Sequence, residues 1–257
     1  MNSTAEAHQF LKVIGDPHRW SILSELALSD RRVGELRDLV DRPQNLVSYH
    51  LRELRQAGLV SSRRSSLDGR DTYYRLDLDR CGKLFTDSAA ALHPALRLVP
   101  GAETLPQRRG RAPKVLFLCT GNSARSQMAE ALLGNRSNHA VEAGSAGSHP
   151  NALHPNAVRV MTERGIDISG NRTKHLSRYA RTRFDYVVTL CDKVSEVCPE
   201  FPGEPARIHW SMPDPSAVGP NDEETYSAFE RTAEEVNVRI DHLIARLFAS
   251  QGGINAR

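Results

Sequence analysis

The sequence predicts two domains of different class: a mostly helical N-terminal domain with a β-hairpin, and a C-terminal α/β domain with a four-stranded parallel sheet. Three observations support this prediction. The chain has 257 residues, which is more than one domain typically holds. A proline-rich stretch without periodicity interrupts it near residue 100. Helical patterns dominate before that stretch, whereas strands and helices alternate after it.

Composition narrows the class of protein further. The chain is 39% hydrophobic and 25% charged, and no apolar stretch approaches the ~20 residues that a membrane helix needs. The N-terminus lacks a basic segment followed by an apolar one, so we expect no secretory signal. The four cysteines are then expected to be reduced thiols of a cytoplasmic protein rather than a disulfide framework.

The N-terminal domain is expected at residues 1–97. A helical pattern over 7–28 breaks at Gly15-Asp16-Pro17, where the proline can open a second helix. Asp68-Gly69 is a hairpin turn signal between two strand-like runs. The remaining elements are helices at 31–40, 43–57 and 79–96, with strands at 59–64 and 71–77. This order is typical of a winged helix-turn-helix.

Residues 98–113 are expected to form a linker, because three prolines, two glycines and a basic cluster occur there without periodicity. Residues 1–112 hold 18 Lys and Arg against 14 Asp and Glu, a balance of +4, whereas residues 113–257 hold 16 against 17, a balance of −1. The positive excess therefore favours a polyanion partner for the N-terminal half.

The C-terminal domain is expected at residues 114–257, with alternating elements that indicate a parallel sheet covered on both faces. The predicted strands are 114–119, 140–147, 184–191 and 206–210, and the predicted helices are 126–134, 154–165 and 223–249.

The stretch "VLFLCTGNSARSQM" places Cys119 at the carboxyl end of the first of these strands, where open α/β sheets bind ligands. Five residues separate Cys119 from Arg125, and a loop of this length at a helix start can form an anion cradle. Arg125 would add a bidentate fork for an oxyanion, and Ser126 can donate a hydrogen bond to the sulfur. Such surroundings favour a thiolate, so we expect a lowered pKa, roughly 3.5–7.5. The alternative is a buried structural cysteine. The expected oxyanion-binding residues are Thr120, Gly121, Asn122, Ser123, Ala124 and Arg125.

These residues resemble the phosphate-binding loop of the low-molecular-weight protein tyrosine phosphatase superfamily, over about residues 113–249. Gln127 is typical of its arsenate reductase branch, since the phosphatases usually have proline there. The resemblance implies that Asp214, in an Asp-Pro pair, is the general acid. Ser216 stands where the phosphatases usually carry tyrosine, which argues against an aryl-phosphate substrate.

The resemblance to thioredoxin-coupled arsenate reductases also implies a relay of three thiols. Cys119 would attack arsenate, Cys191 would attack Cys119 and release arsenite, and Cys198 would then attack Cys191. Thioredoxin would reduce the resulting disulfide, with a small thiol as the alternative reductant, and no cofactor would be bound. Two incidental thiols in a loop are the alternative for Cys191 and Cys198. Some relatives bind potassium near this loop, but His175 stands where an acid is expected, so we predict no metal site.

The stretches "IGDPHRWSILSEL" and "LVSYHLRELRQAGLV" and the hairpin resemble the ArsR-type family of bacterial repressors, over about residues 5–95. The resemblance implies a homodimer that binds a DNA operator through the helix at 43–57 and the wing. The alternative is a protein-binding module. The expected DNA-binding residues are Gln44, Asn45, Ser48, Tyr49 and Arg52 on the helix and Arg63, Arg64 and Arg70 on the wing.

Two features argue against metal sensing by the N-terminal half. Arg32 and Gly34 stand where founding members of that family hold two cysteines, and arginine cannot ligate a soft metalloid. Cys81 is the only cysteine of this half. The ten histidines form no spaced cluster with cysteines or carboxylates, so His149, His154 and His209 are expected at the surface or in packing. Two functions remain open: a regulator fused to an arsenate reductase, or a regulator whose phosphatase-like half senses an oxyanion or redox state or acts as a phosphatase.

Overall fold

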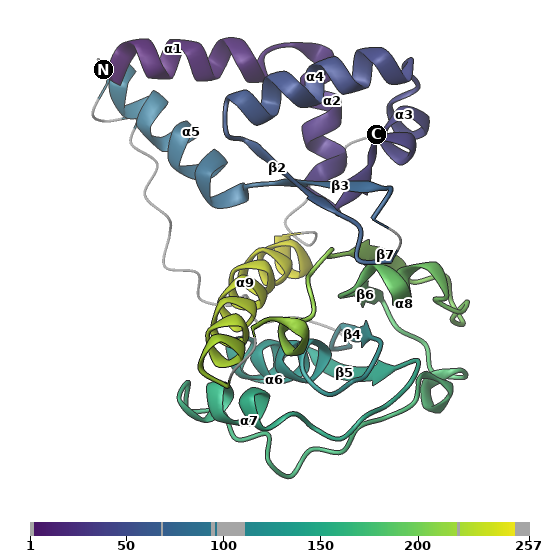
Figure 1. Cartoon of the computed structure of the whole chain (residues 1–257). Helices are drawn as coiled ribbons and strands as arrows, with labels where there is room; N and C mark the ends of the chain where they lie inside the picture. The colour runs from purple at the N-terminus through teal and green to yellow at the C-terminus, as the bar shows by residue number, and fades with distance from the viewer. Residues whose placement is uncertain (1–2, 68, 94–95, 97–110, 220–221, 250–257) are drawn as a thin grey trace. The chain divides into compact units, whose positions relative to one another are not determined.

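The computed structural model describes residues 3–67, 69–93, 96, 111–219 and 222–249. The chain divides into two compact units, Met1–Glu103 and Thr104–Arg257 (Figure 1). Residues 98–110 of the predicted linker at 98–113 lie outside the described residues, and so does Asp68 of the predicted turn.

The first unit is mostly helical, with a small antiparallel sheet in the order β1-β3-β2. The third predicted helix begins two residues late, because Arg31 and Arg32 pair with Tyr74 and Tyr73 of β3 as a short strand. The last helix ends at Leu92 rather than at residue 96. The elements are α1 (Ser3–Ile14), α2 (Pro17–Leu26), β1 (Arg31–Arg32), α3 (Val33–Val40), α4 (Gln44–Gln56), β2 (Val60–Arg64), β3 (Thr72–Leu76) and α5 (Leu78–Leu92).

Local sequence signals determine where α2 begins and where α4 ends. Pro17 opens α2, and the Asp16 carboxylate accepts the backbone N–H groups of His18 and Arg19 at 2.9 and 3.0 Å. The chain turns after α4 at Gly58, whose φ of +69° favours glycine. Helix α4 is amphipathic: Val47, His50, Leu51 and Leu54 are buried. Of these, Val47, Leu51 and Leu54 pack with apolar residues of α2 and α3 in one core cluster.

The second unit contains a four-stranded parallel sheet in the order β5-β4-β6-β7. Three further helical segments were not predicted: α8 and the 3₁₀ turns η2 and η3. The elements are β4 (Lys114–Cys119), α6 (Arg125–Arg136), β5 (Glu142–Gly147), α7 (Pro155–Thr162), η2 (Leu176–Tyr179), β6 (Tyr186–Thr189), α8 (Asp192–Glu196), β7 (Ala206–His209), η3 (Pro215–Ala217) and α9 (Asp222–Ala249).

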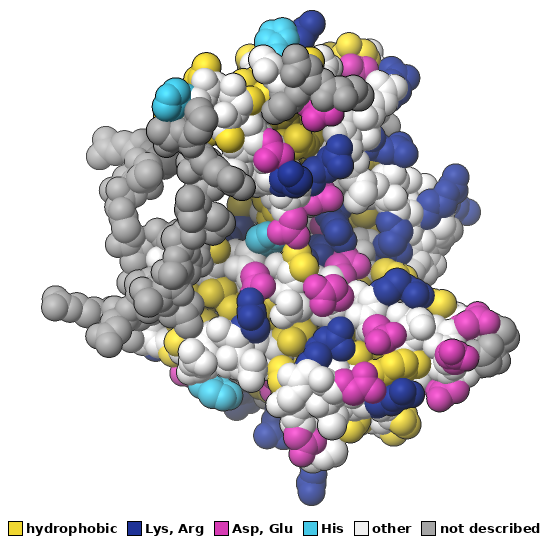
Figure 2. Space-filling model, turned by 90° about the vertical axis from the view of Figure 1, so that its left-hand side faces the viewer, with side chains coloured by type: hydrophobic (Ala, Val, Ile, Leu, Met, Phe, Trp, Pro, Cys, Tyr) yellow, Lys and Arg dark blue, Asp and Glu magenta, His cyan; other side chains and the backbone are white. Residues whose placement is uncertain are grey.

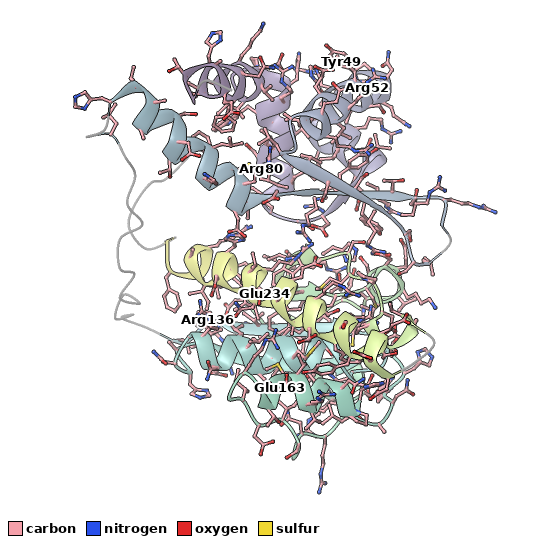
Figure 3. All side chains as sticks on the ribbon, turned by 60° about the vertical axis from the view of Figure 1, so that its left-hand side comes forward. Tyr49, Arg52, Arg80, Arg136, Glu163 and Glu234 are labelled. Carbon is pink, nitrogen blue, oxygen red and sulfur yellow. The ribbon has the colours of Figure 1, made fainter. Side chains whose placement is uncertain are left out.

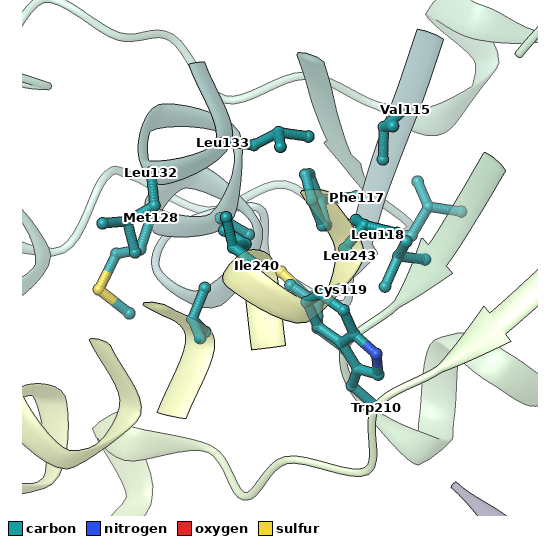
Figure 4. Close-up of a cluster of buried hydrophobic side chains, with 14 of the residues drawn as sticks. Val115, Phe117, Leu118, Cys119, Met128, Leu132, Leu133, Trp210, Ile240 and Leu243 are labelled. Atoms are coloured by element: carbon teal, nitrogen blue, oxygen red, sulfur yellow. The ribbon is translucent and has the colours of Figure 1, made fainter. Parts of the chain in front are cut away.

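The core of the second unit lies between the sheet and the pair α6 and α9, which pack against each other (Figure 4). Phe117 of β4 is fully buried there and lies 6.0 Å from the Trp210 ring, centroid to centroid. Cys119, at the end of the same strand, belongs to this cluster. The packing therefore fixes the strand end from which residues 120–124, the candidate active-site loop, depart.

The predicted classes, a helical domain with a β-hairpin and an α/β domain with a four-stranded parallel sheet, are confirmed. Among the described helices, none combines the length and apolar character needed to cross a membrane.

Candidate active site and nucleic-acid interface

A loop of five residues joins Cys119, the last residue of β4, to Arg125, the first residue of α6. Its carbonyl groups point toward the segment after β5: Thr120, Gly121 and Ser123 accept backbone N–H groups from residues 149, 151 and 154, each at 2.9 Å. In a trans peptide the carbonyl and the following N–H point in opposite directions. The N–H groups of residues 121, 122 and 124 therefore face the other side of the loop, where Asn122 N–H reaches the Cys119 sulfur at 3.2 Å.

Gly147, at the end of β5, allows this close approach. A Cβ atom at that position would lie 2.5 Å from the Thr120 carbonyl oxygen and 2.8 Å from the Asn122 nitrogen. Any side chain would therefore displace the loop. Gly147 was not among the predicted site residues, although its run of small residues, "GSAG" (144–147), was a signal.

Asn122 is fully buried and fixes the shape of the loop from within. Its φ of +46° is a conformation that asparagine tolerates better than most residues. Its side-chain N–H groups donate to Ser126 Oγ and Ser145 Oγ, both at 2.8 Å. Its side-chain oxygen accepts Lys174 N–H at 2.7 Å and a Gln127 N–H at 3.2 Å. The role of this side chain is thus to hold the loop together.

The Cys119 sulfur lies 3.0 Å from Ser126 Oγ. Because that oxygen already accepts a hydrogen bond from the Asn122 side chain, the Ser126 hydroxyl proton is available for the sulfur. Burial raises the pKa of the Cys119 thiol, and the Arg125 charge and the Ser126 hydrogen bond lower it without outweighing burial. The expected low pKa is therefore wrong for this arrangement, because only 2% of Cys119 is exposed and a carboxylate balances the charge of Arg125.

That carboxylate belongs to Asp214. The buried Arg125 guanidinium donates to Asp214 Oδ2 at 3.0 Å through Nη2 and to the Met212 carbonyl at 3.0 Å through Nη1. Burial raises the pKa of Asp214, but Arg125 and the hydrogen bonds from Ser216 lower it further, so the net shift is downward. The structure thus places Asp214, predicted as the acid, directly against Arg125 in its ionised form.

Cys191 lies against the same loop. Its sulfur is 3.3 Å from Thr120 Oγ1, and only 2% of the residue is exposed. The sheet brings these residues together, because β4 and β6 are neighbouring parallel strands with Leu118 opposite Thr189. Cys198 lies past the end of α8, half-buried, and burial raises the pKa of its thiol. All four cysteines are free thiols.

Two hydrogen-bonded networks next to this site, one partly and one fully buried, contain no predicted site residue. Glu130 accepts from Ser145 Oγ and from the Lys174 ammonium, the latter at 3.0 Å. Asp192, directly after Cys191, accepts from His209 and from Ser211. Among the described residues, no group of three or more His, Cys, Asp or Glu side chains is suited to hold a metal ion.

The predicted DNA-binding residues of α4, Gln44, Asn45, Ser48, Tyr49 and Arg52, are all exposed. Tyr49 and Arg52 lie together on the outward side of the helix, with the guanidinium 5.8 Å from the ring centroid (Figure 3). On the wing, Arg64 and Arg70 are exposed and Arg63 is half-buried. Arg64 Nη1 donates to the Gly69 carbonyl at 3.0 Å and so ties the turn.

Basic and acidic side chains are interspersed over the face drawn in Figure 2. On that face, then, attraction of a polyanion depends on local groups of basic residues rather than on one broad positive field.

Comparison with known proteins matches each unit to a family. Residues 114–251 match the model of the low molecular weight phosphotyrosine protein phosphatases, and residues 16–62 match that of the bacterial regulatory proteins of the arsR family. An arsenate reductase of Halalkalibacterium halodurans is 40% identical over 126 residues, 49% of this chain and 91% of that protein. An arsenate reductase of Bacillus subtilis is 38% identical over the same coverage.

Solved structures with a similar fold include one described as an arsenate reductase in oxidized state. It is 29% identical, covers 52% of this chain and 98% of its own, and has a TM-score of 0.46. A thioredoxin-dependent arsenate reductase of Corynebacterium glutamicum is 30% identical over 65% of this chain and 76% of its own, with a TM-score of 0.44.

Proposed function

Because the chain belongs to the low molecular weight phosphotyrosine protein phosphatase family and carries an arsR-family DNA-binding domain, we propose that it is a DNA-binding regulator fused to an arsenate reductase. The observation that carries the proposal is the position of Cys191 beside the active-site loop. Ester hydrolysis on Cys119 needs no second thiol, whereas reduction of an oxyanion does.

The first step would form a bond between sulfur and arsenic. The loop N–H groups and Arg125 would bind arsenate, and the Cys119 thiol would give its proton to an arsenate oxygen as its sulfur attacks the arsenic(V) atom. One oxygen leaves as water, with Asp214 supplying a proton. When arsenate takes the N–H groups of Arg125, Asp214 loses that cationic partner, which raises its pKa and allows it to act as an acid.

The second step would reduce arsenic. Cys191 attacks the Cys119 sulfur, a disulfide forms, and the sulfur–arsenic bond breaks with its electron pair left on arsenic, now arsenic(III). Cys198 then attacks Cys191 and frees Cys119. The sum is arsenic acid plus two thiols giving arsenous acid, water and a disulfide. A dithiol such as thioredoxin would restore the thiols in the reducing cytoplasm.

Peptide mapping can test the relay. Trypsin should release the cysteines on separate peptides, 115–125 for Cys119, 184–193 for Cys191 and 194–207 for Cys198. After one turnover without thioredoxin, we expect the second and third peptides to be joined. In Cys198→Ser the first and second should be joined instead. If every thiol stays free after a stoichiometric turnover, a small-thiol mechanism replaces the relay.

Turnover measurements test the enzyme itself. Arsenate-dependent NADPH oxidation is measured with thioredoxin and its reductase, with a small thiol in their place, and with neither. Cys119→Ser should abolish it, because the site cannot ionise a hydroxyl, while Cys81→Ser, the matched control in the other unit, should retain it. Substantial turnover by Cys119→Ser would refute the assignment. Aryl-phosphate hydrolysis without arsenate turnover would favour the phosphatase alternative.

For the arsR-family half we propose a homodimer that binds a palindromic operator with α4 in the major groove and the wing on the backbone. Apolar residues on the outside of α1 and α5 support a dimer through these helices: Leu11 is 49% exposed and Leu92 is 80% exposed. Light scattering of the full chain tests the dimer, and Leu11→Asp should convert it to a monomer. A dimer that survives this change would contradict the proposed interface.

A further inference from the structure

Asp192 is a fully buried carboxylate next to a thiol that the proposed relay uses. It follows Cys191 directly and is the first residue of α8. Its Oδ1 accepts the Ser211 hydroxyl at 2.7 Å and lies 3.1 Å from His209 Nε2. Because an unpaired buried carboxylate is strongly disfavoured, these contacts fix the position of residue 192 in the fold.

The partners of Asp192 are themselves held by the sheet. His209 lies opposite Thr189 in the pairing of β6 and β7, and its Nδ1 is 2.8 Å from Thr189 Oγ1. Both of its ring nitrogens therefore have partners, which sets the orientation of the ring. Two neighbouring strands thus hold the chain at the residue after Cys191.

The end of α8 nearer to Cys198 is held differently. Val194 is still buried, but Glu196 is exposed and Val197 is 61% exposed. The five residues of α8 (Asp192–Glu196) lie between Cys191 and Cys198, and a helix of that length rises about 7.5 Å. A disulfide needs Cα atoms about 4.4–6.8 Å apart. We therefore expect this helical turn to rearrange when Cys198 reaches Cys191.

We propose that Asp192, held by His209 and Ser211, is a positioning residue that keeps Cys191 beside the active-site loop while the Cys198 end of α8 moves. This role rests on the proposed arsenate reductase function. Without this anchor (the Asp192 carboxylate with His209 and Ser211), the Cys191 sulfur would move away from Thr120. The attack of Cys191 on Cys119 would then slow, while oxyanion binding and the attack of Cys119 on arsenate would keep their rates.

The first test needs no arsenate. Reduced full-length protein is alkylated with iodoacetamide, and the rates at peptides 115–125, 184–193 and 194–207 are compared by mass spectrometry. In Asp192→Ala we expect alkylation of Cys191 to rise about tenfold, equivalent to ~1.4 kcal/mol of easier opening. The rates at Cys119 and Cys198 should stay within about twofold. Glu196→Gln, which removes an exposed carboxylate from the same helix, is the matched control and should change no rate.

The second test follows the disulfide in the Cys198→Ser background after arsenate is added. Adding Asp192→Ala should slow formation of the Cys119–Cys191 bond about tenfold, and Asp192→Asn, which keeps an acceptor oxygen, should restore part of the rate. Protection of Cys119 from alkylation by inorganic phosphate should be unchanged. If Asp192→Ala does not fold, Ser211→Ala, which removes one donor, takes its place.

Three results would overturn the proposal. One is a Cys191 alkylation rate within twofold of wild type in a folded anchor variant. Another is an unchanged rate of disulfide formation. The third is a loss of phosphate protection at Cys119 as large as the loss in the rate of disulfide formation, which would indicate general damage to the site. If the Cys198→Ser parent forms no Cys119–Cys191 disulfide with arsenate, the proposed function fails, and the alkylation rates still decide the role of Asp192.

Discussion

Replacing Ser126 with alanine should raise the pKa of Cys119. The Ser126 hydroxyl is fully buried 3.0 Å from the Cys119 sulfur, and its proton is free to donate because Asn122 donates to its oxygen. A thiolate gains more from this donor than a thiol does. Loss of the hydrogen bond therefore disfavours ionisation, and both residues are too buried for bulk water to replace it.

The size of the shift follows from the energy of a hydrogen bond to a charged group. Such bonds contribute about 1.5–3 kcal/mol, and one pKa unit equals about 1.4 kcal/mol, so the pKa should rise by roughly 1–2 units. The thiolate that remains is more nucleophilic, with a Brønsted coefficient of about 0.4–0.5. The alkylation rate at neutral pH should then fall only about 3- to 16-fold.

The assay is alkylation of peptide 115–125 by iodoacetamide at neutral pH, with the ratio of the wild-type and variant rates as readout. Ser169→Ala, a change of the same kind at an exposed position, is the control. An alkylation rate of Ser126→Ala that equals or exceeds the wild-type rate would refute the reasoning.

Three further predictions concern the N-terminal half. Arg52→Ala should weaken operator binding, as fluorescence anisotropy can measure. The double change Arg63→Ala with Arg64→Ala should weaken it too and should reduce the slope of log affinity against log salt by about two, because each arginine would lose one phosphate contact. An unchanged slope would mean that the wing does not contact phosphates. Burial lowers the pKa of His50, so the unfolded chain binds the proton more readily and stability should fall as pH drops below about 6.5. The fall in melting temperature between pH 7.5 and 5.5 should be smaller in His50→Leu than in wild type, and an equal fall would assign it to other groups. Operator affinity should differ between reduced and oxidised protein if the C-terminal half controls DNA binding, and it is measured with and without arsenite. If arsenite releases the DNA from wild type but not from Cys81→Ser, the sensor lies in the N-terminal half instead.

Sequence periodicity predicted the order of helices and strands because each element forms from neighbouring residues. Pro17 and Gly58 mark helix ends through their own backbone preferences. The placement of Cys119 at a strand end and Arg125 at a helix start likewise required only local patterns.

The supporting residues of the site were not predictable in this way. Lys174 meets Glu130, and His209 meets Asp192, only because the strands are ordered β5-β4-β6-β7. The pKa of Cys119 was mispredicted for a related reason. The motif shows the positive groups, but the burial of the sulfur and the pairing of Arg125 with Asp214 come from distant parts of the chain.

The pairing of β4 with β6 has a consequence for how this chain can change in length. Cys119 and Cys191 lie far apart in sequence, yet backbone hydrogen bonds between adjacent strands set their separation, with Leu118 opposite Thr189. Surface loops that do not touch the active-site loop can therefore gain or lose residues without moving the two sulfurs. A slip of one residue between these strands would instead turn Cys191 toward the opposite face of the sheet. Insertions and deletions should thus be tolerated in the outer loops and excluded from the four residues of β6.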